Sequence, residues 1–353
     1  MSGPKPSQAT MLGHTLMTLV IAAAGGFVGQ MAQIPAGWLM GSALAAAGAA
    51  LAGVKVTVPG RLRDITFVLT GMSMGANVAR DSLSLIAQWP ISLLGLALEL
   101  VLIIATTGYM LRKLFRLDNA TAYLSSFPGH LSFVMGIAAT GLGDPRQITI
   151  IQVIRIMMLT LCVPMGALFL PIEHFPAPAN IVVMDAQTLV MLAIACAITG
   201  FLFTRLRVPA GMVLGAMAAA TAAKLGGLFD GAMPVPLANL TFVLVGALIG
   251  SRFAGITLTE FRQAAIGGLI ATAMTVGIVT AIAYGVSLLV DMPFGQIWLG
   301  LSPGALEGMG ALGVALGYDT AFIAAHHVSR LLMLTVAIPL VAMIVAPRKS
   351  QPV

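Results

Sequence analysis

The stretch Pro35-Ala36-Gly37-Trp38-Leu39-Met40-Gly41 occurs a second time in this chain, as Pro209-Ala210-Gly211-Met212-Val213-Leu214-Gly215. Two further pairs of segments match at nearly the same distance: residues 66–71 with 241–246, and residues 128–164 with 303–339. All offsets are 174 or 175 residues. The sequence therefore predicts a duplication that extends over the whole chain.

The composition predicts an integral membrane protein. Of the 353 residues, 59% are hydrophobic and only 8% are charged, and the mean hydropathy is +1.00. Apolar runs of about 17 to 25 residues, the length needed to cross a bilayer, recur along nearly the whole chain and leave no room for a soluble domain. The first run is preceded by only one charge, Lys5, and is expected to be an uncleaved signal-anchor. Cys162 and Cys196 both lie in apolar runs, so no disulfide framework is expected.

Each half is predicted to contain five spans and one interrupted apolar segment. In the first half the spans are near 11–32, 36–54, 64–79, 83–111 and 147–171, and the interrupted segment is 119–143. In the second half they are near 186–204, 209–227, 237–254, 263–290 and 320–346, and the interrupted segment is 294–317. The first repeat is therefore placed at 11–171, an external linker at 172–185, and the second repeat at 186–346.

Corresponding loops of the two halves carry opposite charge. Lys55, Arg61 and Arg63 follow the second span of the first half, whereas the matching loop of the second half contains Asp230. Arg112, Lys113 and Arg116 follow the fourth span, and the matching loop contains Asp291. Positive charge favours the cytoplasmic side, so corresponding loops are expected on opposite faces and the repeats on inverted paths.

Inversion requires an odd number of crossings in each half, so the interrupted segment is expected to be a re-entrant hairpin of two half-helices. With this assumption both termini are cytoplasmic, in the inner membrane of a bacterial cell. Fourteen of the eighteen Lys and Arg residues then face the cytoplasm. The alternative for each interrupted segment is a continuous helix with a proline kink.

The two interruptions are the expected binding site. Their candidate substrate-binding residues are Ser126, Pro128, Gly129 and His130 in the first half, and Ser302, Pro303 and Gly304 in the second. Proline and glycine both break helices, and a half-helix that begins at such a break offers free N–H groups and a partial positive charge to an anion. The two breaks are therefore expected to meet near the middle of the membrane around an anionic solute.

Arg155 and Arg330 occupy identical positions of the two copies, several residues inside their spans. A buried guanidinium in a membrane must face protein or water, and it is suited to clamp a carboxylate or phosphate. Direct substrate contact is one alternative. The other is an ion pair with Asp144, Asp319 or Glu307.

The candidate groups for proton or ion coupling are Glu307, His327, Asp144 and Asp319. Glu307 follows the second break and has Ser132 as its counterpart, and it is either a protonation site or a fixed partner of Arg330. His326 and His327 are about 100° apart on a helix, so at most one of them is expected in the site. Glu99, in an otherwise aliphatic run, is either a second proton site or a helix contact, and the contact is favoured.

The chain resembles the bacterial AbrB-type membrane protein family. The resemblance rests on the paired Pro-Ala-Gly-x-x-x-Gly and Pro-Gly-x-Leu motifs, followed in the second half by Gly317-Tyr318-Asp319 and His326-His327-x-x-Arg330, and it covers nearly the whole chain. It implies an internal AbrB duplication, a fold like those of inverted-repeat cation/proton antiporters and anion transporters, and the labels ammonia monooxygenase and regulator of AidB expression. It implies no catalytic residues.

The sequence favours an all-α polytopic secondary transporter of a small anionic organic solute, with proton or ion coupling. No nucleotide-binding motif, cofactor or nucleic-acid-binding module is found, and the expected partners are the lipid bilayer and a small-molecule or ion substrate. A homodimer is an open alternative. A membrane monooxygenase is disfavoured, since no convergent set of metal ligands is evident among the five histidines. A membrane regulator of gene expression is the third alternative, acting indirectly through a transported solute.

Overall fold

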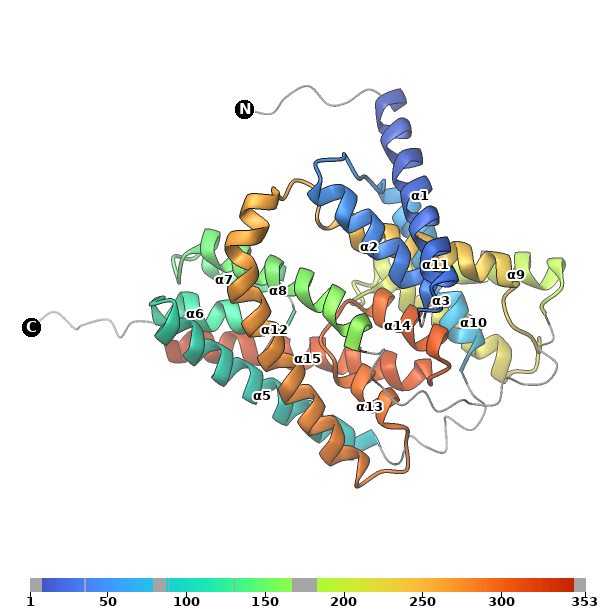
Figure 1. The fold of residues 1–353 in the computed structure, drawn as a ribbon. Coiled ribbons are helices and arrows are strands. Elements are labelled where there is room, and N and C mark those ends of the chain that lie inside the picture. The colour runs from blue at the N-terminus through green and yellow to red at the C-terminus, as the bar shows by residue number, and fades with distance from the viewer. Residues whose placement is uncertain are drawn as a thin grey trace, which may run out of the picture. The chain divides into compact units, whose positions relative to one another are not determined.

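The computed structural model describes residues 8–34, 36–78, 87, 89–129, 131–166 and 183–345, and these residues are mainly helical (Figure 1). The helices of the first half are α1 (Gln8–Met31), α2 (Gly37–Leu51), α3 (Gly60–Ala76), α5 (Trp89–Leu114), α6 (Asn119–Ser126), α7 (Leu131–Ala138) and α8 (Pro145–Gly166). Those of the second half are α9 (Ala186–Arg205), α10 (Gly211–Leu225), α11 (Val235–Ser251), α12 (Leu258–Ser287), α13 (Phe294–Leu301), α14 (Leu306–Leu316) and α15 (Thr320–Val345). The predicted all-α fold is confirmed.

Both interrupted segments are broken into two separate helices, so the alternative of a continuous kinked helix is wrong. The first pair, α6 and α7, forms a hairpin whose ends lie together. The backbone N–H of Asp144, which follows α7, donates to the hydroxyl of Thr121 in the first turn of α6 at 2.8 Å. Gly143 lies against the same turn: a Cβ on this glycine would be 3.0 Å from the Thr121 nitrogen. The chain therefore leaves the first hairpin where it entered.

Five described helices are long and apolar enough to cross a membrane, namely α1, α5, α9, α12 and α15. The helices at the predicted spans 36–54 and 209–227 are shorter than expected: α2 and α10 each have 15 residues, whereas a full crossing needs about 20. The repeated motif is the reason. Ala36 and Ala210 adopt left-handed backbone angles before the helices, and Gly53 and Gly227 do so after them. Left-handed residues cannot continue an α-helix, so both helices are limited at both ends.

The chain forms two compact units, and each draws on both predicted repeats. Unit 1 contains α1–α3, α9–α11 and α14, and unit 2 contains α5–α7, most of α8 and α12, α13, and most of α15. These units cross the boundaries of the predicted repeats at 11–171 and 186–346. The predicted linker at 172–185 lies outside the described residues up to position 182. The inverted paths of the two repeats remain a prediction.

In unit 1 the helices of the two halves pack on one another through glycine faces. On α3, a Cβ at Gly71 would lie 2.3 Å from the Val213 carbonyl oxygen of α10. On α11, a Cβ at Gly246 would lie 2.8 Å from the Leu39 carbonyl oxygen of α2. Gly71 matches Gly246, and Leu39 matches Val213, so equivalent positions make equivalent contacts across the halves. Only glycine permits this approach of backbones, as in many membrane helix pairs.

In unit 2 the first hairpin is buried among longer helices. Leu124 and Phe127 from the end of α6 pack with Leu100 and Ile104 of α5 and with Leu334 of α15 in one apolar cluster. This packing places the first break inside unit 2.

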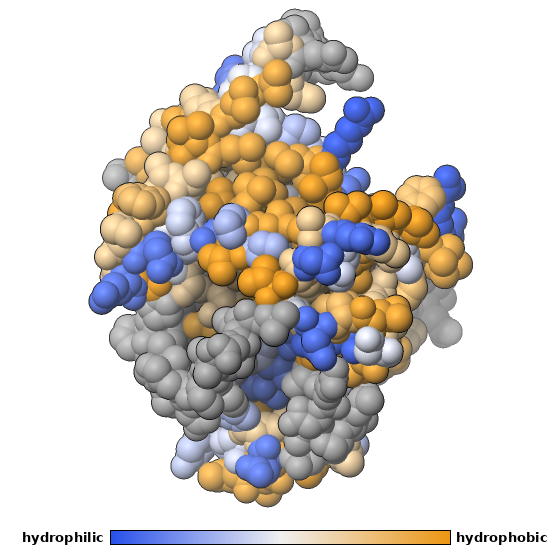
Figure 2. Space-filling view, turned by 90° about the vertical axis from the view of Figure 1, so that its right-hand side faces the viewer, coloured by the Kyte–Doolittle hydropathy of each residue, from blue (hydrophilic) through white to orange (hydrophobic). Residues whose placement is uncertain are grey.

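Large apolar side chains also point outward. Figure 2 shows hydrophobic residues over much of the visible surface. Exposed examples on the long helices include Val101 at 64%, Ile198 at 63% and Ile344 at 80%. A soluble protein rarely exposes so much contiguous apolar surface, whereas lipid chains cover it without cost. The apolar exterior therefore agrees with a membrane protein.

Candidate functional site

The first break separates α6 from α7 by four residues. After Ser126 the chain becomes extended at Phe127, with φ −63° and ψ 124°. Gly129 has φ 129°, a value open to glycine alone among common residues, and a Cβ there would lie 3.4 Å from Leu334 of α15. His130 lies outside the described residues. The Pro-Gly pair thus ends one half-helix and allows the next to begin in another direction.

Arg155 of α8 holds the C-terminal end of α6. Its side chain is 1% exposed, and its Nη1 donates to the carbonyl oxygens of Ser125 at 3.0 Å and Ser126 at 2.8 Å. Its Nη2 donates to the carbonyl oxygen of Phe127. One turn earlier, Gln152 donates to the carbonyl oxygen of Leu124 at 2.8 Å. The arginine therefore compensates both the unpaired carbonyls and the partial negative charge that a helix carries at this end.

The second break repeats this arrangement. Arg330 of α15, 2% exposed, donates through Nη2 to the carbonyl oxygens of Gly300 at 3.0 Å and Leu301 at 3.2 Å, at the end of α13. One turn earlier, the Nε2 atom of His327 lies 3.3 Å from the carbonyl oxygen of Leu299. Every one of these residues is 175 positions after its counterpart at the first break.

The hydrogen bonds of the two arginines go to backbone carbonyls rather than to Asp144, Asp319 or Glu307, and direct substrate contact by either arginine remains a prediction. Asp144 instead accepts from the backbone N–H groups of Arg146 at 2.8 Å and Gln147 at 3.3 Å, at the start of α8. Asp319 accepts from the N–H of Ala321 at 2.9 Å, at the start of α15. Both aspartates thus cap helix starts.

Glu307 lies in the first turn of α14 and forms an ion pair with Arg252, which follows α11, at 2.5 Å. The alternative that made Arg330 its fixed partner is therefore wrong. The two side chains are 11% and 30% exposed, so the pair is largely shielded from solvent. The sequence gave no signal for this pairing because Arg252 is 55 residues away and has no basic counterpart in the first half.

The remaining polar groups at the breaks differ between the halves. The hydroxyl of Ser126 donates to the carbonyl oxygen of Tyr123 at 2.7 Å. Ser302 is 1% exposed, and its hydroxyl has no hydrogen-bond partner among the described residues. Pro128 and Pro303 are buried, whereas Gly304 is exposed. A buried hydroxyl without a protein partner is a group that a bound solute could satisfy.

Unit 2 contains a buried carboxylate, Glu99, for which the sequence favoured a helix contact over a proton site. Glu99 of α5 has no exposed surface, and neither of its carboxylate oxygens finds a hydrogen-bond partner in the part of the chain that the structure describes. It interacts electrostatically with Arg330. Nearer the start of the same helix, the Ser92 hydroxyl lies 2.8 Å from Nε2 of His326. The sequence identified Glu99 as a lone acid among aliphatic residues, but it gave no signal for the interaction with Arg330, which lies 231 residues later.

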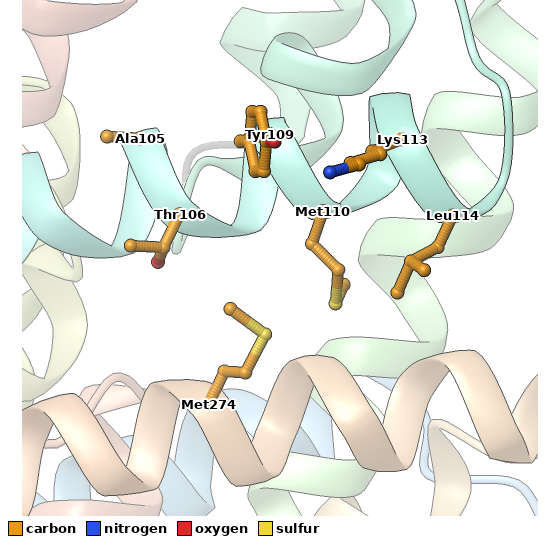
Figure 3. Close-up of a pocket in the computed structure, with 7 residues that line it drawn as sticks. All are labelled: Ala105, Thr106, Tyr109, Met110, Lys113, Leu114 and Met274. Atoms are coloured by element: carbon orange, nitrogen blue, oxygen red, sulfur yellow. The ribbon is translucent and has the colours of Figure 1, made fainter.

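Unit 2 also has a cavity of about 500 Å³ between α5 and α12 (Figure 3). Its wall on α5 is formed by Ala105, Thr106, Tyr109, Met110, Lys113 and Leu114, and Met274 of α12 faces them. The Lys113 ammonium lies 5.5 Å from the centre of the Tyr109 ring, a cation–π contact. None of the residues at the two breaks lines this cavity.

The chain matches the family model described as the transition state regulatory protein AbrB over residues 38–346. It is 24% identical to the protein YhjN of Bacillus subtilis (strain 168), over 92% of this chain and 91% of that protein. It is also 24% identical to the candidate regulator AbrB of Escherichia coli (strain K12), over 90% of this chain and 93% of that protein. The resemblance inferred from the motifs is confirmed, and the family description and the name of the E. coli relative both describe a regulator.

Proposed function

Since the chain belongs to the family of the transition state regulatory protein AbrB and has membrane-type apolar helices, we propose that it is a secondary transporter of a small organic anion. It lies in the inner membrane of a bacterial cell with both termini in the cytoplasm. The two repeats thread the membrane in opposite senses, and their breaks converge on one chamber.

The observation that carries this proposal is the pair of buried arginines at the two breaks. Irregular backbone is tolerated at membrane depth only where protein or a water-filled cavity covers it. Arg155 and Arg330 satisfy the carbonyl groups at the ends of α6 and α13, at the expense of burying two positive charges. A structural break alone needs no cation, since a neutral donor such as Gln152 can bind a carbonyl as well. The excess positive charge at both breaks favours an anion.

The remaining donors at the breaks complete the site. The helices that follow, α7 and α14, begin with N–H groups that are unpaired within the helix, and Ala305 gives α14 no side-chain cap. In this proposal Ser126, Pro128 and Gly129 line the chamber from the first break, and Ser302, Pro303 and Gly304 line it from the second. Arg155 and Arg330 act as positioning residues, while Glu307 and His327 are held close to the second break by Arg252 and Leu299.

The test is a thermal-shift panel on the purified protein in detergent, with acetate, succinate, glutamate and inorganic phosphate as probes and choline as the cationic control. We expect at least one acid to raise the melting temperature and choline to leave it unchanged. Ser302→Ala should weaken the binding of the stabilising acid by about fivefold to tenfold, since one hydrogen bond contributes roughly 1 kcal/mol to the binding free energy. Ser251→Ala is the matched control, because its hydroxyl bonds only within α11. The absence of any acid response, together with no uptake of the acids into liposomes, would overturn the proposal.

A second candidate function is regulation of gene expression, which the name of the E. coli relative favours. No nucleic-acid-binding module is evident in the sequence, so this effect would follow from movement of a signalling solute. The two candidates separate in a deletion strain complemented with Ser302→Ala. If expression changes together with the reduced uptake of this variant, regulation follows flux, and if the native expression pattern is restored in full at reduced uptake, regulation is independent of flux.

A further inference from the structure

We propose that Glu99 binds and releases the proton that is coupled to transport, and that its charge state sets how firmly Arg330 holds the end of α13. This inference rests on the proposed function. It departs from the interpretation of Glu99 as a passive helix contact.

The first step is the position of the carboxyl group. Glu99 lies near the middle of α5, between the buried residues Leu96, Leu100 and Ile103. Both of its oxygens are buried without a hydrogen-bond partner among the described residues. Burying an ionised carboxylate without hydrogen bonds is far more costly than burying the neutral acid. The surroundings thus leave only one described group to compensate the ionised form, the guanidinium of Arg330 with which it interacts.

The second step is the spare bonding capacity of Arg330. A guanidinium has five N–H donors. Nη2 is engaged with the carbonyls of Gly300 and Leu301, and Nε has no partner among the residues described. When Glu99 is ionised, it competes with the two carbonyls for the cation. When a Glu99 oxygen takes up a proton from water, the Arg330 guanidinium interacts with the carbonyls of Gly300 and Leu301 alone. Proton uptake therefore alters the contacts of the second break without breaking any covalent bond.

The third step is a polar route to the site. Ser92 precedes Glu99 by seven residues, or two helical turns, and His326 precedes Arg330 by four, so each pair lies on one face of its helix. Ser92 and His326 contact each other at 2.8 Å, and the Trp89 ring packs on His326. The interface of α5 and α15 thus carries the Ser92–His326 contact, which lies closer to the N-terminal ends of both helices than the electrostatic interaction of Glu99 with Arg330.

The other ionisable groups near α5 have their own partners. His326 bonds to Ser92, and His327 faces the carbonyl oxygen of Leu299 on α13. On α6, Tyr123 packs its ring against Gly108 of α5. On α8, Arg155 is bonded to the end of α6. Among the described residues, Glu99 interacts electrostatically with Arg330 alone.

The first test observes proton binding itself, by infrared difference spectroscopy of the reconstituted protein during a pH titration, with no solute added. A protonated carboxyl group in an apolar setting has a distinct carbonyl stretching band. We expect this band to appear as the pH falls, to vanish in Glu99→Gln, and to shift in Glu99→Asp. Met274→Gln is the matched control, because Met274 is the residue 175 positions after Glu99 and should leave the band unchanged. A band that is unaffected by Glu99→Gln overturns the inference.

The second test measures coupling in liposomes, with radiolabelled succinate or glutamate, whichever gives the larger thermal shift. In Glu99→Gln, exchange of label at equal pH should persist, while accumulation driven by an inward proton gradient should fall at least about tenfold, within the range of known coupling energies. If the variant accumulates label like the native protein, the inference fails and the transporter proposal stands. If neither protein moves label but the infrared band follows Glu99, the transporter proposal fails and the proton site stands.

Discussion

Two helix pairs of unit 2 occupy corresponding places in the duplicated chain, yet they differ in chemistry. The first pair is α5 with α15, and the second is α12 with α8. Both pairs include a buried arginine that holds the end of a half-helix, Arg330 in the first and Arg155 in the second. The α5–α15 pair adds Glu99, His326 and His327. Their counterparts in the other pair are Met274, Ile151 and Gln152.

The shared and the divergent features have different physical roles. Each broken helix needs a donor for its terminal carbonyls, and this need is the same in both halves. Both halves carry an arginine at this position, which binds the carbonyls and also adds a positive charge to each break. Glu99 and His326 add nothing to that task, and they occur on one side only. The duplication supplies the scaffold, and the differences between its copies point to the function.

The largest expected effect comes from replacing the arginines. Arg155→Met and Arg330→Met should each destabilise the protein by about 3 kcal/mol or more, since several buried carbonyls lose their donor. Thermal unfolding in detergent measures the loss. Adding Glu99→Gln should recover part of the stability of Arg330→Met, because it removes a carboxylate left without its cation. It should recover none in Arg155→Met. If Glu99→Gln changed the stability of Arg330→Met and of Arg155→Met by the same amount, the interaction of Glu99 would not be specific to Arg330.

The next effect tests unit 1, where the halves are expected to behave alike. A Cβ at Gly75 would lie 2.5 Å from the Met217 carbonyl oxygen, and one at Gly250 would lie 2.3 Å from the Ala46 Cβ. Gly75→Val and Gly250→Val should each cost about 1 to 3 kcal/mol through overpacking, with similar losses of melting temperature. Gly48→Val on α2 is the control, since its Cβ would meet nothing within 4 Å. A loss confined to one of the two variants would mean that the contacts are not equivalent.

A smaller effect separates the starts of the two hairpins. Asp118 accepts a hydrogen bond from the Thr121 N–H at the start of α6, whereas α13 begins after Pro293 without a side-chain cap. Asp118→Ala should cost about 1 kcal/mol, a typical cap contribution. Asp118→Asn, which can also cap, should lose less.

The cap also has a defined pH dependence. Partial burial raises the pKa of Asp118, but hydrogen bonds from Thr121 outweigh this and hold the pKa below its ordinary value of 3.8. The contribution of the carboxylate is thus complete above that value and is lost as the pH falls through the lowered pKa. Acid titration of thermal stability should show this loss in the native protein and not in Asp118→Ala.

The smallest effect on stability is expected from exchanging the residues that precede the arginines. Gln152 and His327 both face a carbonyl oxygen one turn before the arginine. His327→Gln should retain this contact and change stability by less than about 1 kcal/mol. If the melting temperature stays and the pH profile of transport moves, His327 contributes a titrating group. If both stay, His327 is only a neutral donor like Gln152.

Much of the fold could be predicted because it depends on local patterns. The apolar runs, the Pro-Gly breaks and the offset of 174 to 175 residues locate the helices to within a few residues. The sequence overestimated the lengths of α2 and α10. The apolar pattern includes Ala36, Gly53, Ala210 and Gly227, whose left-handed backbone angles limit both helices. Hydropathy alone does not report backbone angles.

The site could be predicted only in outline. The sequence identified the arginines and the breaks as belonging together, but it named carboxylates as partners where carbonyls are found. Charge patterns suggest ion pairs, whereas the carbonyls of a broken helix are invisible in a list of side chains. The electrostatic interaction of Glu99 with Arg330 and the ion pair of Glu307 with Arg252 both depend on how distant segments fold together.

The packing of helices from one half on helices from the other, through glycine faces in unit 1, has a consequence for biosynthesis. α2 finds its partner Gly246 on α11 only after roughly 200 further residues have left the ribosome. Until then α2 packs only on α1, through Gly41, while the faces of α2 and α3 that meet the second half stay unmatched in the lipid. We therefore expect the first half to be less stable alone, and a ribosome stalled at mid-chain to leave a substrate for membrane quality-control proteases.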